Sequence, residues 1–125
     1  MSFIEFKHIG KKYAGADKNS VSDFNLEINE KEFIAFVGPS GCGKSTTLRM
    51  VAGFEEITEG DLYIDGKKVN EIAPRDRGIA MVFQNYALYP HMTVEKNIGY
   101  GLKNMKMPAD QIKKKVDWAI DILGL

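Results

Sequence analysis

The sequence lacks the features that mark secreted or membrane-spanning chains. Its only cysteine is Cys42, which excludes an intrachain disulfide and fits a reducing compartment. Its longest apolar runs, residues 33–37 and 79–83, are far shorter than the roughly 20 residues that a membrane-spanning helix needs. The first 20 residues carry charges such as Glu5 and Lys7 where a signal peptide would be apolar. We therefore expect the chain to stay in the compartment where it is made.

The chain also lacks an excess of either charge. Lysine and arginine number 17, and so do aspartate and glutamate. Proteins that bind the phosphate backbone of nucleic acid usually have a basic excess, so this balance argues against nucleic acid as a partner. At 125 residues, with 44% hydrophobic and 27% charged residues, the chain has the size and composition of one globular domain.

Alternating polar and apolar residues predict an antiparallel sheet in the first part of the chain. Phe24, Leu26 and Ile28 alternate with polar residues, which is typical of a strand with one buried face. Residues 3–9 form a second predicted strand, and a polar loop joins the two. Residues 62–69 predict a hairpin, because their central Asp-Gly pair suits a tight turn.

Two runs are apolar at every position, residues 33–37 and 79–83. A strand that is covered on both faces has this pattern. We therefore expect both runs to be buried strands of a central sheet.

Three helices are expected. The first spans residues 44–52 and ends at Gly53, a common helix stop. The second follows the capping residue Thr93 and runs to about residue 103. Pro108 can open the third, in which Trp118 is expected to pack. The apolar residues of one face of this helix are Ile112, Val116, Ala119 and Leu123.

The strongest functional motif lies between the first apolar run and the first helix. Two glycines five positions apart are followed by Lys44 and Ser45, the pattern of a phosphate-binding P-loop. The glycines allow backbone N–H groups to surround an anion, and the helix start adds its positive dipole end. Lys44 would contact the outer phosphates of a nucleotide, and the Ser45 hydroxyl would bind Mg²⁺. The alternative is a glycine-rich turn that only caps a helix.

Two further segments resemble a known family once this loop is placed. Tyr13 lies upstream of the loop, and Met81-Val82-Phe83-Gln84 lies downstream. The whole chain resembles the nucleotide-binding subunit of an ABC transporter, most closely that of sugar importers of the maltose and multiple-sugar type. The resemblance implies that Tyr13 stacks on adenine and that Gln84 approaches Mg²⁺ and the attacking water. The alternatives are an ordinary turn tyrosine and a polar strand end.

The resemblance implies an α/β fold: a partial P-loop NTPase core with an N-terminal antiparallel β subdomain and the start of a helical subdomain. All 125 residues would be the N-terminal part of one nucleotide-binding domain, with the β subdomain and P-loop over about 1–84 and the Q-loop and helical region over about 85–125. The implied ligands are ATP and Mg²⁺. The expected site residues are Tyr13, Gly38, Pro39, Ser40, Gly41, Cys42, Gly43, Lys44, Ser45, Thr46 and Gln84, with Lys44 and Gln84 catalytic and Ser45 and Gln84 on the metal.

The resemblance also implies macromolecular partners. These are a second copy of the ATPase subunit and membrane-spanning permease subunits, which would place the chain in the cytoplasm, on the inner face of the membrane. Residues 85–93 are aromatic and apolar without strand or helix periodicity, and they resemble the segment that contacts the permease. Burial of this segment under the last two helices is the alternative.

Several parts of the family pattern are missing. The sequence contains no Leu-Ser-Gly-Gly-Gln motif, no strand ending in Asp-Glu and no later switch histidine. Because hydrolysis in the family uses these parts, we expect the isolated chain to bind ATP weakly, to hydrolyse almost none and to self-associate through its incomplete sheet. Whether the chain is itself an enzyme therefore stays open.

Two other functions remain open. A small P-loop kinase would share the phosphate loop, although Arg75 and Arg77 would be a sparse lid and Tyr13 would have no role. A non-catalytic interaction fragment would keep the loop without using it.

Overall fold

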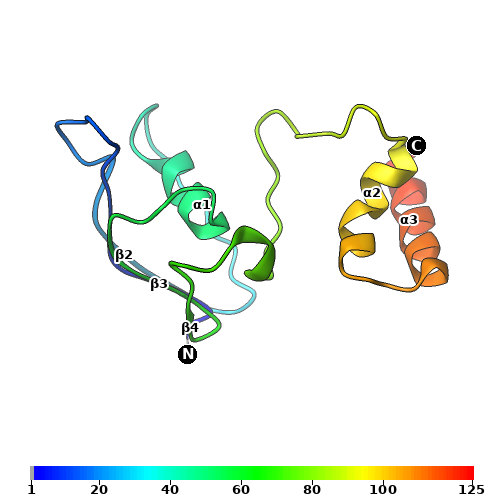
Figure 1. The fold of residues 1–125 in the computed structure, drawn as a ribbon, viewed down its shortest axis with the longest axis horizontal. Coiled ribbons are helices and arrows are strands. Elements are labelled where there is room, and N and C mark those ends of the chain that lie inside the picture. Colours follow the sequence, from blue (N-terminus) through cyan, green and yellow to red (C-terminus); the bar gives the residue numbers. More distant parts are fainter. Residues whose placement is uncertain (1) are drawn as a thin grey trace. The chain divides into compact units, whose positions relative to one another are not determined.

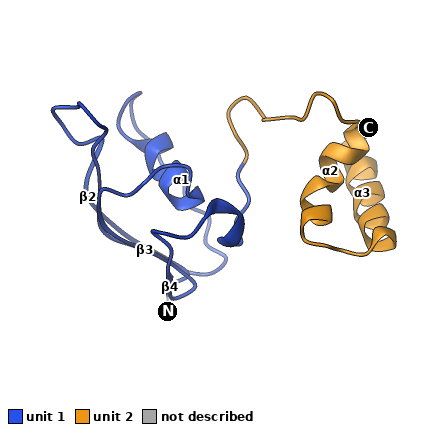
Figure 2. Cartoon of the chain, viewed as in Figure 1, with its two compact units in different colours: residues 1–81 blue, residues 82–125 orange. Residues whose placement is uncertain are grey.

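The computed structural model describes residues 2–125 (Figure 1). The chain divides into two units, residues 1–81 and residues 82–125, which Figure 2 colours separately. The first unit contains a sheet and one helix, and the second contains two helices. Among the described residues, no helix is both long enough and apolar enough to cross a bilayer.

The sheet of the first unit is antiparallel, as the alternating pattern predicts. Its strands are β1 (Ile4–Lys11), β2 (Val21–Ile28), β3 (Glu59–Ile64) and β4 (Lys67–Lys68), in the spatial order β2-β1-β3-β4. The central strand β1 pairs Ile4 with Ile28 on one side and with Ile64 on the other. The buried side chains of Phe6, Ile9 and Leu62 form the middle of the core.

The turn between β3 and β4 confirms the predicted hairpin. Asp65 and Gly66 both have positive φ angles, 49° and 73°. A tight two-residue hairpin turn requires this conformation, which glycine adopts without steric cost.

Helix α1 (Lys44–Ala52) packs on the sheet through Met50, which is almost fully buried in the same core. The helix ends as predicted at Gly53, whose φ is 83° and whose N–H group faces the carbonyls of the last turn. Beside this end lies the guanidinium of Arg77, a residue that is 8% exposed. Arg77 donates hydrogen bonds to the carbonyl oxygens of Met50 (2.8 Å) and Val51 (3.1 Å) in α1 and of Ile72 (2.8 Å).

The two expected buried strands are not strands. Residues 33–37 and 79–83 pair with no strand among the described residues. Phe33 is 94% exposed and Val37 is 89% exposed, although Phe36 lies edge-on to Phe24 at 6.0 Å. A run that is apolar on both faces forms a strand only when neighbouring strands supply its hydrogen bonds and covering layers bury it. The antiparallel sheet provides neither for these runs, so the prediction is wrong for this chain.

The second unit is a pair of helices, α2 (Val94–Asn104) and α3 (Ala109–Leu123). The Thr93 side chain caps α2 by accepting a hydrogen bond from the Lys96 N–H, as predicted. The helices pack closely at Gly99, where an added Cβ would lie 3.3 Å from the side chains of Ile112 and Val116. The expected packing of Trp118 is wrong, because that residue is 67% exposed.

Candidate functional site

The glycine-rich loop, residues 38–43, leads directly into α1. Gly41 and Gly43 have φ angles of 81° and 94°. At Gly43 any side chain would be excluded, because a Cβ would lie 2.7 Å from the Ser20 carbonyl oxygen. The sequence therefore places glycine where the chain needs both a left-handed backbone and space beside the neighbouring loop.

The first turn of α1 is suited to hold an anion. Its N-cap, Gly43, has no side chain to bond the free N–H groups, and none of the described residues of the first turn is acidic. The early N–H groups of a helix have no intrahelical partner, and the helix dipole makes this end positive. The Thr47 side chain donates a hydrogen bond to the Gly43 carbonyl at 2.8 Å and, within the described chain, accepts none from these N–H groups. The N–H groups that begin the helix are thus left to a ligand or to water.

The side chain of Lys44 holds the loop in shape. Its ammonium donates to the carbonyl oxygens of Gly38 at 2.6 Å and Pro39 at 2.8 Å, and it lies 3.4 Å from the Cys42 sulfur. A hollow of about 300 Å³ opens beside this lysine. The residues that line it are Ser20, Ser40, Gly41, Gly43, Lys44, Ser45 and Thr46.

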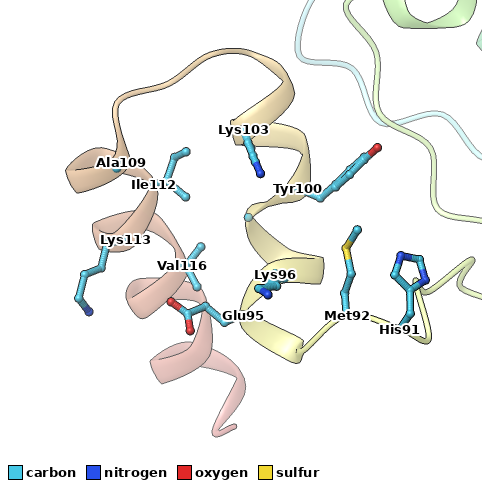
Figure 3. A pocket seen from close by; sticks show the side chains of 11 residues that line it. His91, Met92, Glu95, Lys96, Tyr100, Lys103, Ala109, Ile112, Lys113 and Val116 are labelled. Atoms are coloured by element: carbon cyan, nitrogen blue, oxygen red, sulfur yellow. The ribbon is translucent and has the colours of Figure 1, made fainter.

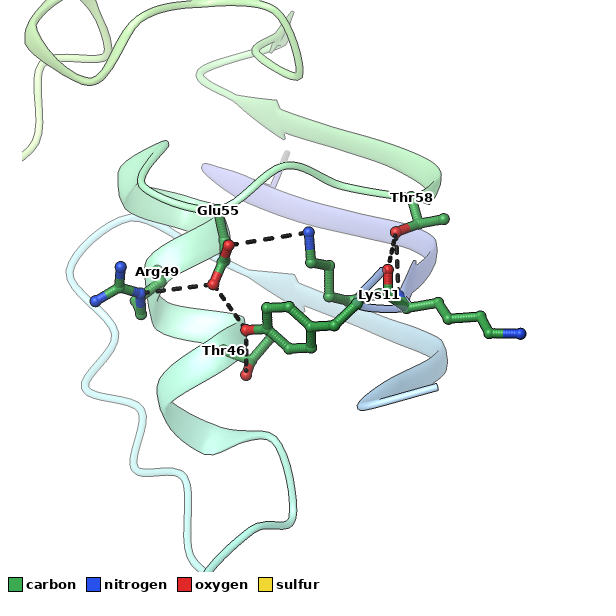
Figure 4. Close-up of polar contacts among 7 residues, drawn as sticks. Lys11, Thr46, Arg49, Glu55 and Thr58 are labelled. Carbon is green, nitrogen blue, oxygen red and sulfur yellow. Dashed lines mark hydrogen bonds and ion pairs between the residues drawn. The ribbon is translucent and has the colours of Figure 1, made fainter. Parts of the chain in front are cut away.

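Tyr13, which lies in the same unit as the loop, contacts the first turn of α1. The Tyr13 hydroxyl lies 3.2 Å from the Thr46 hydroxyl in the first turn of α1. The same hydroxyl donates a 2.7 Å hydrogen bond to the Glu55 carboxylate, which is also close to Lys11 and Arg49 (Figure 4). The tyrosine residue itself is 37% exposed. Sequence reasoning missed Glu55, because nothing local links residues 42 positions apart.

Gln84 belongs to the other unit and occupies an exposed turn that follows residues 82–83. Its backbone neighbourhood is unusual, because Tyr86 and Ala87 both have positive φ angles, 64° and 49°. The expected approach of Gln84 to a metal beside Ser45 remains a prediction. Within residues 2–125 no group of three or more histidine, cysteine or acidic side chains could hold a metal ion by itself.

The aromatic segment 85–93 is only partly packed. Tyr86 and Leu88 are exposed, whereas the Tyr89 ring lies 4.5 Å from that of Tyr100 on α2. The side chain of Asn97 holds the end of the segment, since it accepts a hydrogen bond from the Tyr89 N–H and donates to carbonyl oxygens before α2. Simple burial of the segment under the helices is therefore not what the structure shows.

A groove of about 590 Å³ lies within the same unit (Figure 3). His91 and Met92 lie at its loop side, and Tyr100 of α2 and Ile112 of α3 also line it. The unit thus combines an exposed aromatic segment with a partly apolar groove.

Comparison with known proteins identifies the family. A model of the ABC transporter family matches residues 21–125. The chain is 65% identical over its full 125 residues to the oligosaccharides import ATP-binding protein MsmX of Bacillus subtilis, of which it covers 34%. It is 61% identical over 122 residues, or 98% of its length, to the multiple sugar-binding transport ATP-binding protein MsmK of Streptococcus mutans, of which it covers 32%.

The fold is shared with a solved ABC cassette. The dimeric structure of the ATP-binding cassette MJ0796 in a post-hydrolysis state, bound to ADP and Pi, matches with a TM-score of 0.83 and 30% identity, over 98% of this chain and 57% of that one. The fold is accordingly a partial α/β P-loop NTPase core. The chain spans about a third of the length of the curated relatives it matches. Because the family model covers most of its residues, the chain belongs to the ABC transporter family.

Proposed function

We propose that this chain is the ATP-binding part of an ATPase subunit that drives carbohydrate import. The proposal depends on the first turn of α1, which has no side-chain cap and, among the described residues, no acidic side chain. Lys44 and a hollow of about 300 Å³ lie beside this turn. Free N–H groups, a helix dipole and an ammonium together favour a polyphosphate. The names of MsmX and MsmK, which describe ATP-binding proteins of sugar transport, support carbohydrate as the cargo.

The roles of the individual residues follow from their chemistry. Residues 38–46 would surround the phosphates, and Lys44 would contact the outer two. The Ser45 hydroxyl would hold Mg²⁺, which typically keeps only one or two protein ligands and takes the rest from phosphates and water. Mg²⁺ would supply charge neutralisation on the phosphates. Tyr13 would stack on adenine, and Gln84 would approach the metal and the attacking water.

We further propose that the 125 residues bind ATP without hydrolysing it at an appreciable rate. Phosphoryl transfer depends on charges and donors that are positioned around the transferred group. The sequence contains no Asp-Glu strand end and no Leu-Ser-Gly-Gly-Gln motif that could supply them. Lys44 and Gln84 alone would position the nucleotide but would not complete the catalytic arrangement.

The proposed partners are a second ATPase subunit and a permease in the membrane, with the chain on the cytoplasmic face. The MJ0796 cassette is a dimer in its solved structure, which supports the first partner. The exposed Tyr86 and Leu88 support the second, because irregular apolar segments on a surface commonly mark protein contacts. The isolated chain would also self-associate through Phe33 and Val37, which are almost fully exposed.

Calorimetric titration with ATP and ADP, with and without Mg²⁺, tests the nucleotide site. We expect weak but measurable binding that Lys44→Ala reduces roughly tenfold or more, since a hydrogen bond to a charged group contributes about 1.5–3 kcal/mol. Lys67→Ala is the matched control, because Lys67 is an exposed lysine of β4 outside the loop. Phosphate transfer to a small acceptor would favour a kinase instead. The absence of any binding would favour an interaction fragment.

A further inference from the structure

We propose that Glu55 is a positioning residue for the nucleotide base, because its carboxylate accepts the hydrogen bond of the Tyr13 hydroxyl and so fixes the ring. The inference rests on the proposed function, in which Tyr13 stacks on adenine. It adds a residue that no motif of the sequence identifies. All the groups involved belong to the first unit, residues 1–81.

The hydrogen bonds around Tyr13 have a defined direction. A carboxylate only accepts, so the single proton of the Tyr13 hydroxyl is donated to Glu55 Oε2 at 2.7 Å. The Thr46 hydroxyl, 3.2 Å away, must then be the donor to the Tyr13 oxygen. The result is a chain of hydrogen bonds from the first turn of α1, through the tyrosine, to Glu55.

Glu55 is itself held from two sides. Its carboxylate lies 3.9 Å from Lys11 Nζ on β1 and 3.8 Å from Arg49 Nε on α1, and its side chain is 21% exposed (Figure 4). Two cations at this distance both attract the carboxylate, which restricts the positions that the side chain can take. The acceptor for the Tyr13 hydroxyl is therefore fixed relative to both the sheet and the helix.

The backbone around Glu55 is equally constrained. On its N-terminal side Gly53 ends α1, and the Phe54 N–H donates to the Arg49 carbonyl at 2.9 Å. On its C-terminal side Thr58 is bonded to the end of β1, because the Thr58 N–H donates to the Gly10 carbonyl and the Thr58 hydroxyl accepts from the Lys12 N–H, both at 3.0 Å. The segment that carries Glu55 is thus attached at both ends to elements that flank the site.

A cation occupies one face of the Tyr13 ring, and the residue is 37% exposed. Lys11 Nζ lies over the ring, 4.9 Å from its centroid, in cation–π geometry. A stacked base would use the opposite face. Ordering a mobile aromatic side chain costs about 0.5–1.5 kcal/mol on binding, and a ring that is already fixed avoids this cost. Glu55 would therefore raise affinity for the nucleoside end of the ligand without touching it.

The experiment compares ATP with inorganic tripolyphosphate, which has phosphates and no base. Calorimetric titrations in the same Mg²⁺ buffer would use the wild-type chain, Glu55→Ala and the control Glu56→Ala. Glu56 is the adjacent exposed carboxylate, so the control removes the same charge from the same segment. We expect Glu55→Ala to weaken ATP binding about threefold to tenfold, the range that corresponds to the ordering cost. Tripolyphosphate affinity should be unchanged, and Glu56→Ala should change neither ligand.

Two more variants separate positioning from folding. Glu55→Gln keeps an oxygen that can accept the phenol proton, and we expect it to retain most of the ATP affinity. Tyr13→Phe keeps the ring and loses both hydrogen bonds, so it should weaken ATP binding as much as Glu55→Ala does. The double variant Glu55→Ala/Tyr13→Phe should bind ATP no more weakly than either single variant, because both substitutions remove the hydrogen bond between Tyr13 and Glu55.

Several results would overturn the inference. They include equal ATP affinity for Glu55→Ala and Glu56→Ala, an equal loss of ATP and tripolyphosphate binding in Glu55→Ala, and additive effects in the double variant. A wild-type chain that binds tripolyphosphate as well as ATP would also overturn it, while leaving the phosphate loop intact. A wild-type chain that binds neither ligand would instead refute the proposed nucleotide site, and the role of Glu55 would fall with it.

Discussion

The buried guanidinium of Arg77 provides the sharpest test of how the first unit is held together. It donates to two carbonyls of the last turn of α1 and to the Ile72 carbonyl, all within 3.1 Å, and to the Asn70 carbonyl at 3.4 Å. Among the described residues, no acidic side chain forms an ion pair with it. Burial lowers the pKa of the Arg77 guanidinium, because removal from water disfavours its charged form. The substitution that tests its role is Arg77→Met, which keeps an unbranched chain close in length to the aliphatic part of arginine and removes the donors.

The magnitude follows from the carbonyls that would lose their Arg77 donor. Met50 keeps the hydrogen bond from the Gly53 N–H at 3.2 Å, so the loss falls on the carbonyls of Val51, Ile72 and, at 3.4 Å, Asn70. A buried carbonyl that loses its donor costs about 1–3 kcal/mol, so these three would together cost several kcal/mol. Part of this loss is offset because the variant no longer buries a charge. We expect a net destabilisation of about 3 kcal/mol, in a unit whose size predicts a total stability of about 4–12 kcal/mol. The urea midpoint should fall by about 1–3 M, because small proteins have m values near 1–3 kcal/mol/M.

Urea unfolding followed by far-ultraviolet circular dichroism measures this shift. The matched control is Arg75→Met. Arg75 belongs to the short 3-10 helix Pro74–Asp76, which Arg77 follows directly, but its side chain is exposed and pairs with Asp76 at 3.6 Å. Exposed ion pairs contribute about 0–1 kcal/mol, so this control should unfold almost as the wild type does. Equal midpoints for Arg75→Met and Arg77→Met would refute the view that the guanidinium supports the end of α1.

Three other perturbations have defined outcomes. Gly66→Ala should destabilise the chain by about 1–2 kcal/mol in urea unfolding, because its φ is 73°, whereas Gly101→Ala, in open space on α2, should stabilise it slightly. Asn97→Asp replaces the donors that hold the loop before α2 with a repelling carboxylate, and hydrogen exchange of that loop should become faster; unchanged exchange would contradict this role. The hydrogen bond from His8 lowers the pKa of the Asp23 carboxyl. The stabilisation that this carboxylate gives to the folded state is therefore complete above the unfolded pKa near 3.8 and is lost as the pH falls through the folded pKa. Asp23→Asn should flatten the decline of the urea midpoint at acid pH.

Local signals predicted the elements that local interactions stabilise. The Thr93 cap, the Gly53 stop and the Asp65-Gly66 turn each act within a few residues, and the structure contains all three. The antiparallel strands could also be predicted, because the alternation of polar and apolar residues indicates which face of a strand is buried. The shape of the glycine-rich loop could be predicted because Gly41 and Gly43 take the positive φ angles that glycine favours, whereas phosphate binding by the loop stays a prediction.

The errors arose where burial depends on distant residues. The run 33–37 is apolar enough for a central strand, but its hydrogen bonds must come from neighbouring strands that its own sequence does not specify. Trp118 was expected to pack for a similar reason, since a large aromatic residue indicates a contact without naming its partner. The contact between Tyr13 and Glu55 joins two turns 42 residues apart, and no periodicity or motif connects them.

The bonds of Lys44 determine what an arriving ligand must displace. An ammonium has three protons, and in the loop two are given to the carbonyl oxygens of Gly38 and Pro39 while the third faces the Cys42 sulfur at 3.4 Å. Because sulfur is a weak acceptor, Lys44 could give up this contact and form a charge-assisted hydrogen bond to a phosphate oxygen, while its two bonds to the carbonyl oxygens stay in place. Lys44 could therefore bind an anion and still keep the two hydrogen bonds that hold the loop.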